Sequence, residues 1–352
     1  MSQHNLRITT RFPPLLLLLI LLAEPALAKR HDLIVMKNGD RITGEVKKLE
    51  KGVLYIEPEY VSSAFGVDWL QVATIESTAG FQVVLNNGDR AAGTIEKVAA
   101  DQAPDGDFRI RNGEHEVSVS GDSVVNIESK QKSFLRQLKG GIDLGYNFTS
   151  GNDQTQVSSD LNATYLSTAW SAGASFTSSF SGQANASKTN LINVSTFVER
   201  FLGSNSSIVG LGDFLHSSQQ QLNLRTTLGG GYGHYWLRTN ETSFRGLFGA
   251  VYTHESFQST AANPTQENIE ALLGVQYQVF QFSRYSLLSE LSVFPGLSDI
   301  GRVRSTTRTT FSIKLINNFR TYFSFWDNFD SRPPVNAKKN ELGISNSVGW
   351  TF

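Results

Sequence analysis

The last twelve residues of the chain alternate between apolar and small polar side chains. The odd positions from 343 onward carry Gly, Ser or Thr, whereas most even positions carry an apolar residue, namely Leu342, Ile344, Val348, Trp350 and Phe352. A period of two indicates an extended strand with one apolar and one polar face. The closing strand of a transmembrane β-barrel presents such a face to lipid, with an aromatic residue at the interface. This stretch therefore predicts a barrel to which the preceding segments contribute the other strands.

The same alternation recurs upstream, from Leu138–Phe148 to Phe319–Asn328. Together with the last stretch, these segments predict about twelve strands, and an even number returns both ends of a bacterial barrel to one side. Tight connections alternate with longer polar ones, as in barrels with short periplasmic turns and longer outer loops. We therefore expect an all-β fold in which residues 131–352 form an antiparallel transmembrane β-barrel of about twelve strands.

Polarity assigns the two faces of these strands. Leu224, Tyr232, Phe248 and Phe323 are examples of apolar residues that we expect on the outside. Charges take the opposite parity because a charge that faces lipid costs about 2–4 kcal/mol at the midplane. The charged residues expected in the lumen are Asp143, Asp160, Asp213, Arg225, Arg245, Glu270, Glu290, Arg308, Lys314 and Arg320. They would form either a salt-bridge network that fills the barrel or the wall of a selective aqueous lumen.

Composition agrees with a strand-rich membrane protein. Charged residues make up 18% of the chain, below the usual quarter, and aromatic residues make up 11%. A net charge of -1 offers no electrostatic surplus for nucleic acid. The chain has no cysteine, which is compatible with the bacterial envelope.

The beginning of the chain has the features of a secretory signal peptide. Arg7 and Arg11 precede an unbroken Leu/Ile block, Leu15–Leu22, and Ala26-Leu27-Ala28 forms a small-x-small cleavage site. The apolar block is much shorter than the roughly 20 residues that a membrane-spanning helix needs. We therefore expect residues 1–28 to be removed.

The first hundred residues after this signal contain a tandem repeat. Residues 35–46 return as residues 84–95, and Ile75-Glu76-Ser77 returns as Ile127-Glu128-Ser129. Each copy carries an Asn-Gly-Asp turn, which suits a tight hairpin. Residues 29–78 and 79–130 are therefore predicted to be two small β-barrel repeats, and the signal peptide and membrane barrel predict a periplasmic location for them.

Two resemblances extend this interpretation. The motif Asn-Gly-Asp-Arg-x-x-Gly, present in both repeats, resembles the opening of Sm-like barrels. The segments Gly145–Asn152 and Leu224–Gly233 are similar to the domain-of-unknown-function 481 family of outer-membrane proteins, some of which are described as salt-induced. This second resemblance implies the location and the barrel fold, and it implies no substrate and no catalytic residues.

One group of residues suggests chemistry. His254, Ser256 and Asn268 have a spacing that resembles the catalytic set of outer-membrane phospholipase A, in which a serine is activated by a histidine that an asparagine orients. However, Asn268 takes the lumen parity and His254 takes the lipid parity, which would separate them. We therefore expect no enzyme, and a lipid hydrolase remains the alternative function. The His residues show no metal-ligand spacing.

The sequence thus predicts a non-enzymatic protein of the bacterial outer membrane that acts as a small channel or as a structural and interaction element. Expected partners are outer-membrane lipid and lipopolysaccharide, a periplasmic protein bound through residues 29–130, and the barrel-assembly machinery, which would recognise Val348, Trp350 and Phe352. No nucleic acid, cofactor or metal is expected.

Overall fold

The computed structural model describes residues 32–61, 63–97, 107–129, 138–149, 154–167, 169–182, 188–257, 264–281, 284–316, 319–333 and 337–351. The expected signal peptide, residues 1–28, and the terminal Phe352 lie outside these ranges. Within them, no helix has the length and apolar character needed to cross a membrane.

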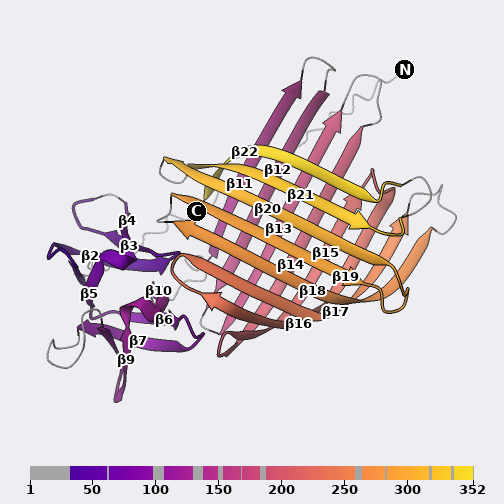
Figure 1. Ribbon diagram of the computed structural model, residues 1–352. Coiled ribbons are helices and arrows are strands. Elements are labelled where there is room, and N and C mark those ends of the chain that lie inside the picture. The colour runs from indigo at the N-terminus through magenta and orange to yellow at the C-terminus, as the bar shows by residue number, and fades with distance from the viewer. Residues whose placement is uncertain are drawn as a thin grey trace, which may run out of the picture.

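The C-terminal part of the chain forms a closed antiparallel barrel of twelve strands (Figure 1). The strands are β11 (Leu138–Thr149), β12 (Gln154–Leu166), β13 (Trp170–Gly182), β14 (Thr189–Gly203), β15 (Ser206–Ser217), β16 (Leu222–Arg238), β17 (Thr242–Phe257), β18 (Thr265–Gln281), β19 (Tyr285–Pro295), β20 (Val303–Ile316), β21 (Phe319–Asp330) and β22 (Asn340–Thr351). Each strand pairs with its neighbours in the chain, and β22 also pairs with β11, from Gly141 opposite Thr351 to Leu144 opposite Val348. This pairing confirms the twelve-stranded barrel and the closing role of the last strand.

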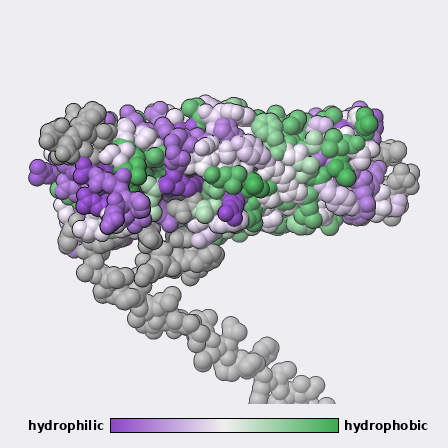
Figure 2. Space-filling view, turned by 90° about the horizontal axis from the view of Figure 1, so that it is seen from below, coloured by the Kyte–Doolittle hydropathy of each residue, from purple (hydrophilic) through white to green (hydrophobic). Residues whose placement is uncertain are grey.

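The outer wall of the barrel is apolar. The side chains of Leu224, Tyr232, Phe248 and Phe323, which were predicted on the outside, are 44–46% exposed. Figure 2 shows hydrophobic residues gathered over the barrel wall, between the mostly hydrophilic N-terminal part and the hydrophilic rim at the opposite end. Such a wall is suited to contact with lipid acyl chains.

A run of glycines lets two barrel strands approach closely. A Cβ atom on Gly249 of β17 would lie 2.0 Å from the backbone oxygen of Gly230 in β16, and one on Gly231 would lie 2.3 Å from that of Phe248. Real side chains do not fit at such distances, so glycine is required at these positions. The run Gly229–Gly231 therefore allows the close packing of these strands.

The N-terminal domain, residues 32–129, consists of ten strands with two short 3-10 turns. The strands are β1 (Asp32–Met36), β2 (Arg41–Glu50), β3 (Val53–Glu57), β4 (Phe65–Asp68), β5 (Val72–Glu76), β6 (Gly80–Leu85), β7 (Arg90–Lys97), β8 (Asp107–Asn112), β9 (His115–Ser120) and β10 (Val124–Ser129), with η1 (Trp69–Gln71) before β5 and η2 (Gly121–Ser123) before β10. The strand orders β5-β1-β2-β3-β4 and β10-β6-β7-β8-β9 are the same. The two sequence copies therefore fold into units of the same topology.

The repeated Asn-Gly-Asp turns also match in detail. The amide of Asn38 donates to Asp40 at 2.8 Å, and the backbone N–H of Asp40 donates back to Asn38 at 3.0 Å. Asn87 and Asp89 make the same two hydrogen bonds at the same distances. The glycine between each pair has a positive φ, 92° in the first turn and 87° in the second, where a side chain would be strained.

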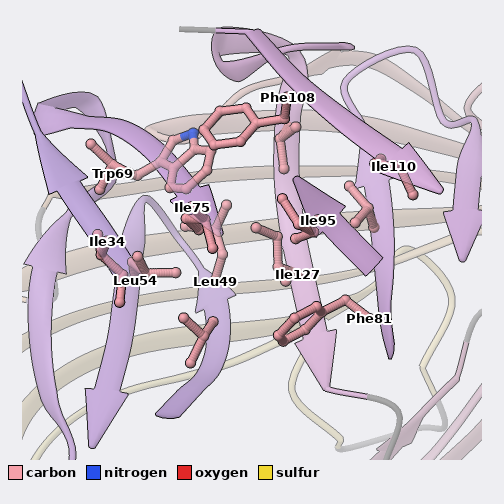
Figure 3. Packing of buried hydrophobic residues seen from close by; sticks show 14 of the residues in the cluster. Ile34, Leu49, Leu54, Trp69, Ile75, Phe81, Ile95, Phe108, Ile110 and Ile127 are labelled. Atoms are coloured by element: carbon pink, nitrogen blue, oxygen red, sulfur yellow. The ribbon is translucent and has the colours of Figure 1, made fainter. Parts of the chain in front are cut away.

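The two units of the N-terminal domain share one hydrophobic core. Strand β2 pairs with β10, which joins both units into one ten-stranded sheet. Figure 3 shows Ile34 and Leu54 of the first unit packed in the same cluster as Phe81 and Ile110 of the second. A unit of about 50 residues buries little apolar surface and is only marginally stable alone, so a common core is physically favoured. Trp69 is buried in this core and is not a surface aromatic.

The N-terminal domain contacts one end of the barrel, here called the domain end. The Lys139 ammonium lies 2.6 Å from a carboxylate oxygen of Glu128. The Asn240 amide, in the connection between β16 and β17, donates to the Val124 carbonyl at 2.9 Å. The Asn205 amide, in the connection between β14 and β15, donates to the Asn86 carbonyl at 2.7 Å. The opposite end of the barrel is called the far end. Connections contain two or three residues at the domain end and four to nine at the far end.

Candidate functional site

The charged residues predicted in the lumen fall into several groups. Arg225 and Glu270 are buried near the far end. In the middle, Arg308 lies 3.5 Å from Asp160, Asp213 accepts a hydrogen bond from Ser195, and Glu290 accepts one from Gln276. Toward the domain end, Arg245 pairs with Glu199, and Lys314 lies opposite Arg320.

Asp143 has an unusual environment in the wall of the lumen. It lies directly opposite Asp160 on the next strand and opposite Gly349 on β22. A Cβ atom on Gly349 would lie 1.5 Å from Asp143 Oδ1, so glycine makes room for this carboxylate. Oδ1 is buried and has no hydrogen-bond partner in the described ranges. The carboxylate therefore lies at the seam where the barrel closes.

The far end contains a compact group of charges, here called the far-end cluster, which consists of Arg225, Arg302, Arg304, Glu255, Glu270 and Asp330. Arg302 is at its centre and is 1% exposed. Its Nη1 lies 2.6 Å from Glu255 Oε2, and its Nη2 lies 2.5 Å from Asp330 Oδ2. Nε donates a further hydrogen bond to Asp330 Oδ1 at 3.1 Å. The guanidinium thus binds two carboxylates in the bidentate manner that its fork geometry favours.

The other two arginines complete the cluster. Arg225 Nε lies 2.6 Å from Glu255 Oε1, and its Nη2 lies 3.6 Å from Asp330 Oδ2. Arg304 forms an ion pair with Glu270. All six side chains are at most 6% exposed. Three arginines face three carboxylates, so the cluster is neutral although it is buried.

These contacts cross the lumen. Arg225 belongs to β16 and Asp330 ends β21, and the strands β17, β18, β19 and β20 stand between them in the ring. Ser217 at the end of β15 donates to Glu341 of β22 at 2.5 Å. Gln220, in the turn after β15, donates to the carbonyl of Asn328 in β21 at 3.3 Å. Residues from opposite walls therefore meet at this level.

An apolar group fills further space at the far end. Leu191, Leu215, Leu222 and Phe257, from four successive strands β14 to β17, are all at most 7% exposed. Trp326 of β21 packs against them from the other side of the lumen. Apolar side chains in contact across the lumen exclude water from this region, which strengthens the neighbouring ion pairs.

Several members of this site were absent from the predicted set. Glu255 and Arg304 carry the lumen parity, so the alternation alone could have identified them. Arg302 lies in a connection at the far end, where a sequence pattern predicts a solvated loop residue. Its inward position depends on Glu255 and Asp330, which are distant in the sequence.

The three residues of the hydrolase alternative are not brought together. His254 lies opposite Glu267 on the outer face, and its Nδ1 is 3.4 Å from a carboxylate oxygen of Glu267. Asn268 lies opposite the buried Thr253 and faces the lumen, as its parity predicts. Asn268 is 7% exposed, and in the amide orientation that satisfies its neighbours it accepts a hydrogen bond from Arg302 at 2.8 Å. Ser256 is on the same face as His254 and away from Asn268.

Two of the three predicted assembly residues, Val348 and Trp350, lie on the outer face of the last strand. Val348 is 53% exposed and Trp350 is 42% exposed, while Phe352 lies outside the described residues. In the described ranges, no group of three or more His, Cys, Asp or Glu side chains is arranged to hold a metal ion.

Several solved structures are similar to this chain. The NanC porin is 12% identical, with a TM-score of 0.40, and the match covers 60% of this chain and 98% of that one. An outer-membrane channel from Pseudomonas putida F1 is 10% identical, with a TM-score of 0.39, covering 61% and 95%. The translocator domain of the autotransporter NalP from Neisseria meningitidis is 13% identical, with a TM-score of 0.35, covering 61% and 87%. At such TM-scores the similarity adds no argument to the fold that strand pairing defines.

No curated protein shows a significant sequence match to the chain. One family model, described as "Protein of unknown function, DUF481", matches residues 142–352, which is more than half of the chain. The match begins within β11 and includes every later strand of the barrel. It confirms the family resemblance seen in Gly145–Asn152 and Leu224–Gly233. The chain belongs to the family described as "Protein of unknown function, DUF481".

Proposed function

We propose that the protein is a non-enzymatic β-barrel of the bacterial outer membrane whose lumen is closed at rest, and that it acts as a structural and interaction element of the envelope. The far-end cluster carries this proposal. It joins opposite walls of the lumen through side chains that are at most 6% exposed. A permanently open channel needs water where these residues pack.

The energetics of the cluster favour a stable closure. Breaking a buried ion pair by removing one partner costs about 3–5 kcal/mol, because an uncompensated charge is left away from water. Arg302 and Arg225 both contact Glu255 and Asp330, so opening the lumen would disrupt several such pairs together. The closed arrangement is therefore the resting state in this proposal.

The orientation follows from the two ends of the barrel. Bacterial barrels have short turns on the periplasmic side and longer loops outside. Because the short connections occur at the domain end, the N-terminal domain lies in the periplasm, where it is available to a protein partner. Each of its two units also resembles an Sm-like barrel, and the Asn-Gly-Asp-Arg-x-x-Gly motif present in both units supports this part of the proposal.

Osmotic swelling of liposomes that contain the full-length protein tests the closed state. We expect these liposomes to swell in a small sugar no faster than protein-free liposomes, because no water-filled path crosses the far-end cluster. Liposomes with a general porin serve as the positive control. Swelling in proportion to the amount of this protein, at a rate similar to that of the porin, would refute the proposal.

A further inference from the structure

A small pocket lies where the N-terminal domain meets the domain end of the barrel. The turn from β6 to β7 contributes Gly88 and Arg90, and the barrel contributes Phe201, Asn205 and Tyr235 among others. The pocket is small, with an enclosed volume of about 10 Å³, and it is partly open to solvent. Ser206, Ser207 and Arg238 add further hydrogen-bond donors to its lining. The hydroxyl groups in this lining can donate or accept, whereas the arginine guanidinium groups can only donate.

The pocket carries an excess of positive charge. Arg90 and Arg238 line it, and Arg245 lies beside it, where its guanidinium donates to the pocket residue Ser207 at 3.3 Å. Arg245 pairs with Glu199, whereas neither Arg90 nor Arg238 has a carboxylate partner in the part of the chain that the structure describes. Glu199 lies near all three arginines and Glu128 acts on Arg90 as well, so the arginines outnumber the nearby carboxylates.

Aromatic rings hold the guanidinium groups in place. The Cζ atom of Arg90 lies 4.0 Å from the ring centroid of Phe201. The Cζ atoms of Arg238 and Arg245 lie 5.0 Å and 5.1 Å from the ring centroid of Tyr235. A guanidinium held by a ring keeps its N–H donors available in its own plane. Nε of Arg90 and Nε of Arg245 are buried and lack a hydrogen-bond partner within the described ranges.

We propose that this pocket binds a phosphate group, either on a lipid headgroup or on a small phosphorylated solute. The planar fork of arginine matches the oxygen atoms of phosphate, and the negative charge of a phosphate monoester or a phosphodiester headgroup would offset this excess of arginines. Burial and then the nearby charge of Arg238 lower the pKa of Arg90 to about 10, so the guanidinium stays protonated at neutral pH. A bound anion would relieve the repulsion between these two arginines.

This site is independent of the closed lumen. The pocket is at the domain end, whereas the far-end cluster is near the opposite rim of the barrel, and phosphate needs no path through the barrel to reach it. A protein that proves to conduct ions could still bind phosphate, and a closed barrel could fail to bind it. The binding experiment therefore does not depend on the proposed function.

Calorimetric titration of the full-length protein in detergent micelles tests the site, with inorganic phosphate and a short-chain phosphatidylglycerol as separate probes. Heat of binding with both probes, or with inorganic phosphate alone, supports a site that admits a soluble phosphate. Binding of the lipid alone supports a headgroup site. The absence of saturable binding with either probe overturns the proposal.

Two sets of variants locate the binding. The double variant Arg90→Gln, Arg238→Gln should weaken the affinity for the bound probe by about tenfold or more, because charge-assisted hydrogen bonds are the strongest contacts available here. Arg111→Gln is the matched control, since Arg111 pairs with Glu96 and does not line the pocket. Heat-dependent mobility on gels checks that each barrel is folded. Equal affinity in the folded double variant and the wild type would also overturn the proposal.

Discussion

Replacing Arg302 with alanine should open the far end of the lumen to small solutes. Arg302 is 1% exposed and forms ion pairs with both Glu255 and Asp330. Its removal leaves two buried carboxylates with Arg225 as their remaining nearby cation, and an uncompensated buried charge costs about 3–5 kcal/mol. Water would enter to solvate the carboxylates. Liposomes that contain the variant should therefore swell in a small sugar several times faster than those with the wild type.

Arg332→Ala is the matched control for this variant. Arg332 is in the connection between β21 and β22 at the same end of the barrel, and its side chain is 54% exposed. It pairs with Asp299 at 2.7 Å, and a surface ion pair contributes only about 0–1 kcal/mol. This change should leave swelling at the wild-type rate. If the Arg302→Ala barrel folds and its liposomes swell at the same rate as those with Arg332→Ala, Arg302 does not hold the lumen closed.

Replacing Trp69 with alanine should unfold the N-terminal domain and leave the barrel intact. The Trp69 ring stacks on Phe108 with 5.3 Å between the centroids, and its Nε1 donates to the Gly121 carbonyl at 2.9 Å. A buried tryptophan replaced by alanine costs about 3–5 kcal/mol. Because Trp69 and Phe108 come from different units, the loss affects the common core. Limited proteolysis should then remove the N-terminal domain at temperatures where the wild type resists.

Tyr60→Ala provides the comparison for this second variant. Tyr60 is an aromatic residue of the same domain, but it is 85% exposed, so its removal leaves no cavity. The resistance of the Tyr60→Ala variant to protease should match that of the wild type. The barrel of both variants should keep its heat-dependent gel mobility. If the N-terminal domain resists protease equally well in the Trp69→Ala and Tyr60→Ala variants, the two units do not depend on a single shared core.

The strands of the barrel could be predicted because lipid constrains one face of every strand and the lumen constrains the other. Leu342, Ile344 and Val348 show the pattern: one face must be apolar, so the period of two persists over the whole strand. The same constraint identifies which charges turn inward, since Arg225 and Glu270 have no other favourable position. The tandem repeat was visible for a different reason, because both copies keep the Asn-Gly-Asp turn.

The contacts that cross the lumen could not be predicted from these patterns. Which inward charges meet depends on the positions of β16, β17 and β21 around the ring, and strand alternation carries no information on this. Arg302 lies outside any alternating segment, so neither its inward position nor its carboxylate partners could be inferred from the sequence. The shared core of the N-terminal domain was missed for a similar reason. The pairing of Leu49 in β2 with Ile127 in β10 joins residues far apart in the sequence.

Single-channel recording of the wild-type protein in a planar bilayer tests the closed lumen most directly. The protein is added at high load, and the Arg302→Ala variant is added to a parallel chamber to show that inserted barrels can be detected. We expect an unbroken baseline for the wild type over a wide range of voltage, because a far-end cluster that closes the lumen would leave no continuous water path. Steady conductance steps of uniform size from the wild type would contradict it.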